Sequence, residues 1–462
     1  MIPSISRRQW LKQLGGGAGA LALQSMLAGD VAADKSENKK SPHHEVKAKN
    51  VIWLFMNGGP SGIDTFDYKP ELAKYHGKVF EGEVKTLFPH PGPLMESPFK
   101  FNRYGESGLP ISEIYSNVAK HADDLCVINS CTSTQLNHVP ACYMMNTGVS
   151  RVGSPSIGSF ATYGLGTENS ELPGFVVMMD RRSAPEGGAN LWDSGFLPPK
   201  YQGVPFRNDG EPVLFLDRSV SRGRQQNRLK FLAKLNQEHL NRNPHNRDLE
   251  TRIQSFETAY KMQASVPDLM KVDDETEDTK RIYGLDDPDC EHFGTQLLLA
   301  RRMVERGVRF QQIFHGGWKR NWDSHGSLGD NHRSLAKETD KPIAGLLRDL
   351  KARGLLESTL VIWGGEFGRL PMSQDIDGRD HNPYGFTMWM AGGGAKKGYV
   401  HGKTDELGYR AVESPVSMND LHATILHLMG VDHERLSYWF SGRDQTMTNS
   451  LGSVVFDICN KS

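Results

Sequence analysis

The stretch KPIAGLLRDLKARGLLESTLVIWGGEFGR, residues 341–369, contains the two kinds of pattern that decide the fold. Its first half carries apolar residues at helical spacing and ends at Gly354, as helices often do. Residues 358–365 form a short run rich in β-branched and aromatic residues, which is typical of a buried strand. Polar residues, beginning with Glu366, follow that run at once. A helix, a strand and a polar loop in this order indicate an α/β unit.

The same alternation recurs along the chain. The other apolar runs are residues 50–56, 124–129, 174–179, 307–314 and 386–392, and further helical patterns are residues 293–307 and 418–430. This alternation predicts an α/β fold in three layers, an α/β/α sandwich built on a mainly parallel sheet. Residues 181–285 interrupt it with Gly/Pro loops and a long charged stretch, and we expect them to form a helical insertion.

Composition excludes some classes of function. The 462 residues include 54 Lys and Arg against 55 Asp and Glu, so the net charge of −1 creates no field that attracts nucleic acid or anionic membrane. We therefore expect no nucleic-acid partner.

The five cysteines include no C-x-x-C pair, which favours buried, inert thiols over a catalytic cysteine. One disulfide could still form in an oxidising compartment.

The N-terminus resembles a targeting signal. Residues 6–33, SRRQWLKQLGGGAGALALQSMLAGDVAA, place Arg7 and Arg8 before a Gly/Ala/Leu stretch and end in small residues. We interpret residues 1–33 as a twin-arginine signal peptide, so we expect export through that route, to the periplasm or otherwise out of the cytoplasm. The alternatives are an ordinary basic helix and a permanent membrane helix, for which the apolar part is short. After cleavage no stable membrane span is expected. The charged residues 34–48 are predicted to be a disordered linker.

Polar residues cluster at the ends of the predicted strands. In open α/β sheets, ligands bind beyond the carboxyl ends of the strands, so side chains that follow different strands can meet in one site. The residues in such positions are Asn57, Asp64, Asp323, His325, Glu366, Arg369, Asp380 and His381.

Each of these residues has a structural alternative. Asp64 in a Gly-Pro-Ser loop can serve a turn, and Asp323 with His325 can form a loop hydrogen-bond cluster. Glu366 needs a partner near its apolar strand, either a metal or Arg369.

Taken as a set, these polar residues predict a metal site. The predicted ligands are Asp64, Asp323, His325, Glu366 and His381, with Asn57, Arg369 and Asp380 in support. Carboxylates mixed with imidazoles suit a divalent ion such as zinc or manganese.

Several motifs in order resemble a known family. FMNGGPSGIDTFDYKP, WDSHG, GGEFGRLP and GRDHNPYGFTMWMAGGGAKKG resemble the bacterial family called domain of unknown function 1501, over roughly residues 49–455. That family resembles a distant branch of the alkaline phosphatase and sulfatase superfamily, which implies an alkaline phosphatase-like sandwich with metal ligands on loops after strands. The resemblance places Glu366 where those enzymes have a carboxylate ligand, Phe367 where they have a histidine, and His381 at their late histidine.

The resemblance fails at the nucleophile. NHVPACYMMNTG, residues 137–148, puts His138 where sulfatases carry a modified cysteine or a serine, and the formylglycine motif is missing. Two functions stay open. One is a metal-dependent hydrolase of phosphate or sulfate esters, on a small-molecule or polysaccharide substrate, with direct attack by water or with His138 as nucleophile or proton carrier. The other is a non-catalytic, metal-stabilised protein that binds anionic polysaccharide or an envelope protein partner.

Overall fold

The computed structural model describes residues 41–87, 91–169, 171–207, 259–263 and 265–460, with the short pieces 212–213, 231–232, 234–236, 238 and 242. The predicted signal peptide, residues 1–33, and residues 34–40 of the predicted linker lie outside the described residues. Residues 41–48 of that linker run along the end of a C-terminal helix. The backbone N–H groups of Lys47 and Ala48 donate to Leu428 O at 2.9 and 2.8 Å. The domain boundaries stay a prediction.

One large sheet forms the centre of the described structure. Its nine strands follow the order β12-β4-β11-β8-β1-β7-β5-β6, with β15 also paired with β4. They are β1 (Asn50–Met56), β4 (Leu125–Thr132), β5 (Phe175–Met178), β6 (Val204–Phe206), β7 (Phe310–His315), β8 (Thr359–Gly364), β11 (Phe386–Ala391), β12 (Tyr399–His401) and β15 (Val416–Ser417). Every pairing is parallel except the two made by β11, with β4 and with β8. The predicted strands and the mainly parallel sheet are confirmed.

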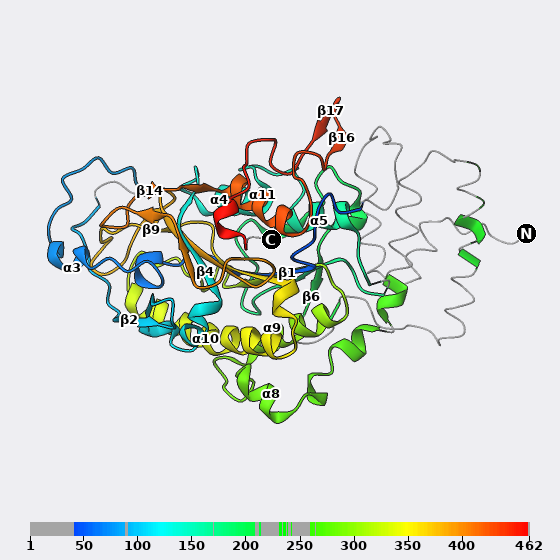
Figure 1. Ribbon diagram of the computed structural model, residues 1–462, viewed down its shortest axis with the longest axis horizontal. Helices are drawn as coiled ribbons and strands as arrows, with labels where there is room; N and C mark the ends of the chain where they lie inside the picture. The colour runs from blue at the N-terminus through cyan, green and yellow to red at the C-terminus, as the bar shows by residue number, and fades with distance from the viewer. Residues whose placement is uncertain are drawn as a thin grey trace, which may run out of the picture.

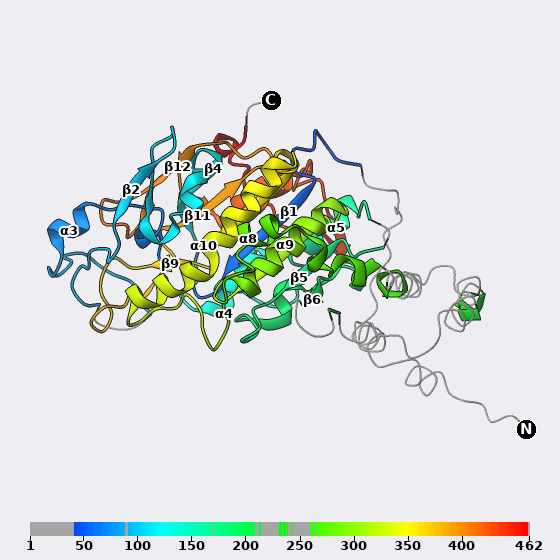
Figure 2. The same ribbon diagram turned by 90° about the horizontal axis from the view of Figure 1, so that it is seen from below.

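Helices cover both faces of the sheet, as Figure 1 shows. On one face lie α4 (His138–Thr147), α5 (Ile157–Leu165) and α11 (Met418–Leu428), and on the other lie α9 (Glu291–Glu305) and α10 (Leu328–Ala352), which cross in front of the strands in Figure 2. Outside these layers are α3 (Glu71–Tyr75) and α8 (Glu277–Ile282). The three-layer α/β/α sandwich is therefore confirmed.

Small two-stranded sheets decorate the edges. They pair β2 (Phe101–Tyr104) with β3 (Leu109–Ser112), β9 (Gly368–Arg369) with β10 (His381–Asn382), β13 (Lys403–Thr404) with β14 (Ala411–Glu413), and β16 (Tyr438–Phe440) with β17 (Arg443–Gln445). In the predicted insertion, residues 181–285, β6 adds an edge strand to the main sheet.

The central strand β1 explains why the sandwich forms. Val51, Trp53 and Phe55 pack into the core on the side of α5 and α11, whereas Ile52 and Leu54 pack into the core on the side of α9 and α10. All are fully buried. Because side chains alternate along a strand, a continuous apolar run fills both faces, which is what a parallel sheet covered by helices requires.

The antiparallel strand β11 has a direct consequence for the candidate site. Parallel strands β1 and β8 end at one edge of the sheet, and β11 begins at that edge because it runs the other way. The residues that precede β11 therefore lie beside those that follow β1 and β8. At its far end β11 turns at Gly392, whose φ is 69° and where an added Cβ would lie 2.2 Å from Leu356 O. This requirement explains the glycines after the strand.

The five cysteines are all free and buried, and no disulfide is found among the described residues. Burial raises the pKa of Cys126 to about 12, so this thiol is not activated. Within the same part of the chain, no helix combines the length and the hydrophobicity needed to cross a bilayer.

Candidate metal centre

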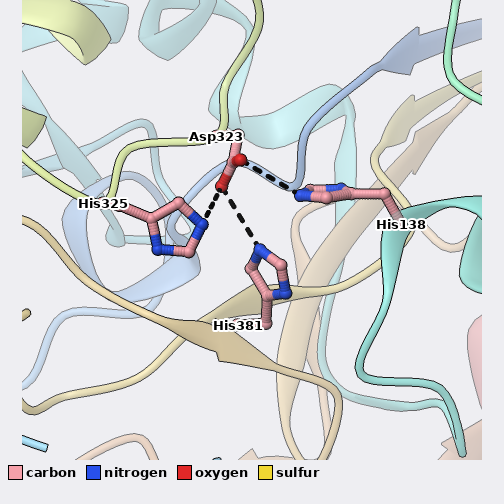
Figure 3. A group of neighbouring side chains, drawn as sticks. All are labelled: His138, Asp323, His325 and His381. Carbon is pink, nitrogen blue, oxygen red and sulfur yellow. Dashed lines mark hydrogen bonds and ion pairs between the residues drawn. The ribbon is translucent and has the colours of Figure 1, made fainter. Parts of the chain in front are cut away.

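Four side chains from distant parts of the chain meet at the edge of the sheet where β1, β7 and β8 end (Figure 3). One possible ligand atom from each lies within 4.8 Å of all the others. The four are His138, Asp323, His325 and His381, and we call them the metal centre. Three of the five ligands predicted from the sequence are therefore together, and they are joined by the histidine that was expected to act in catalysis.

Local structure positions each of these side chains. Asp323 and His325 lie in the loop that follows β7. His138 is the first residue of α4, whose N-cap Asn137 accepts the N–H of Val139 at 3.3 Å. His381 lies in β10, opposite Arg369 of β9. The start of a helix, one loop and one short edge strand thus supply the site, and none of its residues is part of the central sheet.

Asp323 lies at the middle of the group. Its Oδ1 is 2.9 Å from His325 Nε2 and 3.3 Å from His381 Nε2, and its Oδ2 is 3.3 Å from His138 Nε2 (Figure 3). The same nitrogen of every ring therefore points to one carboxylate.

The second nitrogen of each ring is held by an oxygen outside the group. The pairs are His138 Nδ1 with Glu366 Oε1 at 2.6 Å, His381 Nδ1 with Leu136 O at 2.7 Å, and His325 Nδ1 with Gln374 Oε1. A carboxylate or carbonyl oxygen only accepts, so each Nδ1 carries a hydrogen. In a neutral imidazole the Nε2 atom is then left with a lone pair, which is the form that binds metals.

These lone pairs require a positive charge between the rings and the carboxylate. Three Nε2 lone pairs facing the oxygens of Asp323 repel one another unless protons or a metal ion lie between them. Protonating every ring would place three imidazolium ions within 4.8 Å of each other. The buried Nε2 atom of His138 lies 3.3 Å from Asp323 Oδ2 without the geometry of a hydrogen bond. A single divalent ion satisfies all of these groups.

The spacing also fits such an ion. Zinc binds imidazole nitrogen and carboxylate oxygen at about 2.0–2.2 Å, so ligands in a tetrahedron lie about 3.3 Å apart. The distances from the Asp323 oxygens to the three rings, 2.9–3.3 Å, are close to that spacing, and the four ligand atoms as a set lie within 4.8 Å of one another. Three imidazoles with one carboxylate suit zinc better than calcium or magnesium, which prefer oxygen ligands. The residues present therefore fit a bound zinc or a similar borderline ion.

In the absence of an ion, a proton on His138 neutralises part of the repulsion between the ring lone pairs and the carboxylate. Burial alone would raise the pKa of Asp323, but Arg369 and the imidazoles outweigh it and hold that pKa well below its usual range. Burial alone would lower the pKa of His138, whereas Asp323 and Glu366 raise it to about 9. Burial lowers the pKa of His381 to about 4. His381 is therefore neutral at pH 7, with its lone pair toward an ionised carboxylate.

Glu366 lies just outside the group. Its oxygens accept the N–H of Gly58 at 2.9 and 3.2 Å, and Oε1 contacts His138 Nδ1. This fully buried carboxylate thus orients a ligand. The sequence predicted Glu366 as a ligand because a buried carboxylate needs a partner. The structure supplies that partner as a histidine and a backbone N–H.

Asp64 lies apart from the other predicted ligands. Its Oδ2 is 2.8 Å from Arg379 Nε and accepts from Ser61 Oγ at 2.5 Å, and both Asp64 and Arg379 are fully buried. Burial alone would raise the pKa of Asp64, but Arg379 holds it below its usual range. Asp64 is therefore a structural partner of Arg379, because the short helix after β1 carries it away from the end of the strand.

Two of the predicted supporting residues do contact the centre. Arg369 Nη1 is 2.7 Å from Asp323 Oδ1, and its other nitrogens donate to the backbone oxygens of Gly58 and Gly59. Asp380 Oδ1 accepts the backbone N–H of His381 at 2.7 Å. Arg369 thus fixes the carboxylate at the middle of the group, and Asp380 fixes the backbone of one histidine.

Asn57, the third supporting residue, connects to a residue that the sequence did not single out. Its Oδ1 accepts the backbone N–H of Glu186 at 3.3 Å. Gln374 and Arg379 were also missed. Gln374 follows no strand, and no local pattern marks it as the partner of a histidine 49 positions earlier. Arg379 directly precedes the Asp380-His381 pair, and its positive charge was the only feature of the sequence that could have indicated a role near the site.

Replacing Glu366 by glutamine tests its role. Glutamine keeps an oxygen that can accept one N–H, so the protein should fold and still take up zinc, with an affinity lower by about 10–100-fold, as for other partners of metal-bound histidines. Competition with a chromogenic chelator measures this change. Complete loss of zinc from a folded Glu366→Gln protein would instead make Glu366 a ligand.

Comparison with known proteins gives one family match and several distant structural matches. A family model described as "Protein of unknown function (DUF1501)" matches residues 48–459. No curated protein matches the chain.

Among solved structures, Ps i-CgsB is similar with a TM-score of 0.37 and 11% identity over 83% of this chain and 72% of that chain. The PsFucS1 sulfatase from Pseudoalteromonas sp. has a TM-score of 0.35 and 14% identity, covering 93% and 75%. The alkaline phosphatase from the Antarctic bacterium TAB5 has a TM-score of 0.35 and 11% identity, covering 83% and 99%. Likeness at this level does not establish a shared activity.

Proposed function

We propose that this chain, which belongs to the DUF1501 family of proteins of unknown function, is a metal-dependent hydrolase of phosphate or sulfate esters. The observation that carries the proposal is the convergence of three imidazole Nε2 atoms on Asp323, each ring held at Nδ1 by an oxygen. A hydrogen bond from the second ring nitrogen to an oxygen is characteristic of histidines that bind a metal.

The residues have separate tasks in this proposal. His138, Asp323, His325 and His381 hold the ion, which when bound polarises an ester oxygen and lowers the pKa of water. Arg369 keeps Asp323 in place. His138 binds the ion and is neither nucleophile nor proton carrier, so water attacks the ester directly. We propose zinc over manganese because imidazoles make up most of the ligand set.

Hydrolysis of model esters tests this function. The purified protein should hydrolyse 4-nitrophenyl phosphate or 4-nitrophenyl sulfate, lose that activity on treatment with a chelator, and regain it when zinc is restored. A protein that contains the metal and cleaves neither these esters nor polysaccharide sulfate esters would contradict the proposal.

The second candidate is a non-catalytic protein that the metal stabilises and that binds anionic polysaccharide or an envelope protein. This second candidate is favoured because both oxygens of Asp323 already have partners. They face three imidazoles and Arg369. In that case removal of the metal lowers the free energy of unfolding, and no ester is cleaved under any condition. The same chelation experiment, read by thermal unfolding and by turnover, separates the two functions.

We also propose that the chain is exported through the twin-arginine route to the periplasm or otherwise out of the cytoplasm. Arg7 and Arg8 support this, because the route recognises the paired guanidinium groups and not positive charge alone. Replacing both by lysine should leave the uncleaved protein in the cytoplasm. Cell fractionation with immunoblotting measures it, and unchanged export of the double variant would refute the proposal.

A further inference from the structure

Glu186 is a buried carboxylate whose hydrogen-bond partners are residues of the loops after β1 and β7. Only 6% of the residue is exposed. Two amide side chains hold it in place: Asn57 Oδ1 accepts its backbone N–H at 3.3 Å, and Asn321 Nδ2 donates to its Oε1 at 3.3 Å. The backbone and the side chain of Glu186 are therefore both fixed.

Its carboxylate is less well bonded than the others in the protein interior. The other buried acidic residues are Asp64, Asp67, Asp124, Asp180, Asp340, Asp349, Glu366 and Asp380. Among the described residues, each of these has an ion pair or accepts a backbone N–H. The Glu186 carboxylate shows only the long bond from Asn321. One long hydrogen bond compensates little of the cost of burying a carboxylate, so a structural role does not account for Glu186.

The two residues that hold Glu186 also adjoin the ligands. Asn321 Oδ1 accepts the backbone N–H of Asp323 at 3.1 Å, so one side chain connects the two acids. Asn57 Oδ1 also contacts the thiol of Cys142 at 3.9 Å, and Cys142 lies one helical turn beyond His138 on the same face of α4. Glu186 is thus linked through Asn321 to the backbone of Asp323 and through Asn57 to the helix that begins at His138.

No other carboxylate of the centre is free to exchange a proton. Asp323 faces Arg369 and the imidazoles, and Glu366 accepts from Gly58 and contacts His138. Burial raises the pKa of Glu186, and the nearby carboxylates of Glu366 and Asp323 act in the same direction. A buried carboxyl group with a raised pKa and only one long hydrogen bond suits proton transfer near neutral pH.

We propose that Glu186 takes up the proton of the attacking water, an inference that rests on the ester hydrolysis proposed above. One O–H bond of water breaks, its proton passes to the Glu186 carboxylate, and the water oxygen bonds to phosphorus or sulfur. The bond from that atom to the ester oxygen breaks, and the leaving oxygen takes a proton from solvent. Glu186 then returns its proton to solvent, so one water and one ester give one alcohol and one oxyanion.

The test compares Glu186→Gln with the wild type and with Glu277→Gln, a matched change at an exposed glutamate. Zinc content, kcat and KM for 4-nitrophenyl phosphate and 4-nitrophenyl sulfate are measured from pH 5 to 9. Glu186→Gln should keep its zinc and its KM, lose about 100–10,000-fold in kcat, and lose the fall in kcat at low pH. Glu186→Asp should retain that fall. Glu277→Gln should behave as the wild type.

The outcomes separate this inference from the proposed function. A Glu186→Gln protein with wild-type kcat and pH profile overturns the proton-transfer role and leaves the hydrolase standing. Loss of zinc from that variant overturns it as well, since Glu186 would then be a ligand. A wild-type protein that hydrolyses neither ester overturns the proposed function and this step with it.

Discussion

Replacing His381 by alanine is expected to lower the affinity of the protein for zinc by at least about 100-fold. Loss of a partner outside the ligand set already weakens binding by about 10–100-fold, and His381 Nε2 faces Asp323 as part of the set itself. Its ring is buried, contacts Phe367 and donates to Leu136 O, and its one ion pair among the described residues is with Asp323, so the chain should still fold. Zinc competition with a chromogenic chelator gives the affinity, and circular dichroism reports the fold.

The matched control is His76→Ala, which removes an exposed histidine whose Nδ1 accepts the N–H of Glu96. That protein should bind zinc as the wild type does. Equal zinc affinity of His381→Ala and the wild type would show that His381 is not a ligand, and the metal centre as described here would then be wrong.

The second large effect is on stability. Replacing Asp64 by asparagine removes the charge that neutralises Arg379, and both side chains are fully buried. Breaking a buried ion pair from one side costs about 3–5 kcal/mol, because the remaining charge stays in the interior. We expect the free energy of unfolding, measured by urea denaturation, to fall by that amount while the zinc content of the folded protein is unchanged.

Two controls make the result specific. Asp278→Asn breaks an exposed ion pair with Arg281 and should change the free energy of unfolding by less than about 0.5 kcal/mol. Replacing Asp64 and Arg379 together by leucine and methionine should cost less than Asp64→Asn alone. Loss of zinc from folded Asp64→Asn would instead return Asp64 to the ligand set.

The layers of the fold could be predicted from the sequence because they depend on the local spacing of apolar residues. The continuous apolar runs at 50–56 and 358–365 require burial on both faces, and helices at 293–307 and 418–430 supply the cover. The start of α10 was not predicted. The helix begins at Leu328 and runs through Pro342, because packing of its apolar face against the sheet outweighs the local cost of proline.

The site was predicted in part for a similar reason. Strand ends determine which loops meet, so the sequence could predict that Asp323, His325 and His381 lie together. The roles of individual acids depend on partners that approach from elsewhere. Glu366 was assigned as a ligand and Asp64 with it, because the sequence does not show that His138 and Arg379 reach them.

The most direct test of the metal centre is X-ray absorption at the zinc edge of the purified wild-type protein after titration with zinc. We expect one zinc per chain, with about three imidazole nitrogens and at least one oxygen at about 2.0–2.2 Å, and the loss of one imidazole in His381→Ala. A protein that binds no zinc at equimolar concentration, or a shell of oxygen alone that is the same in both proteins, would contradict it.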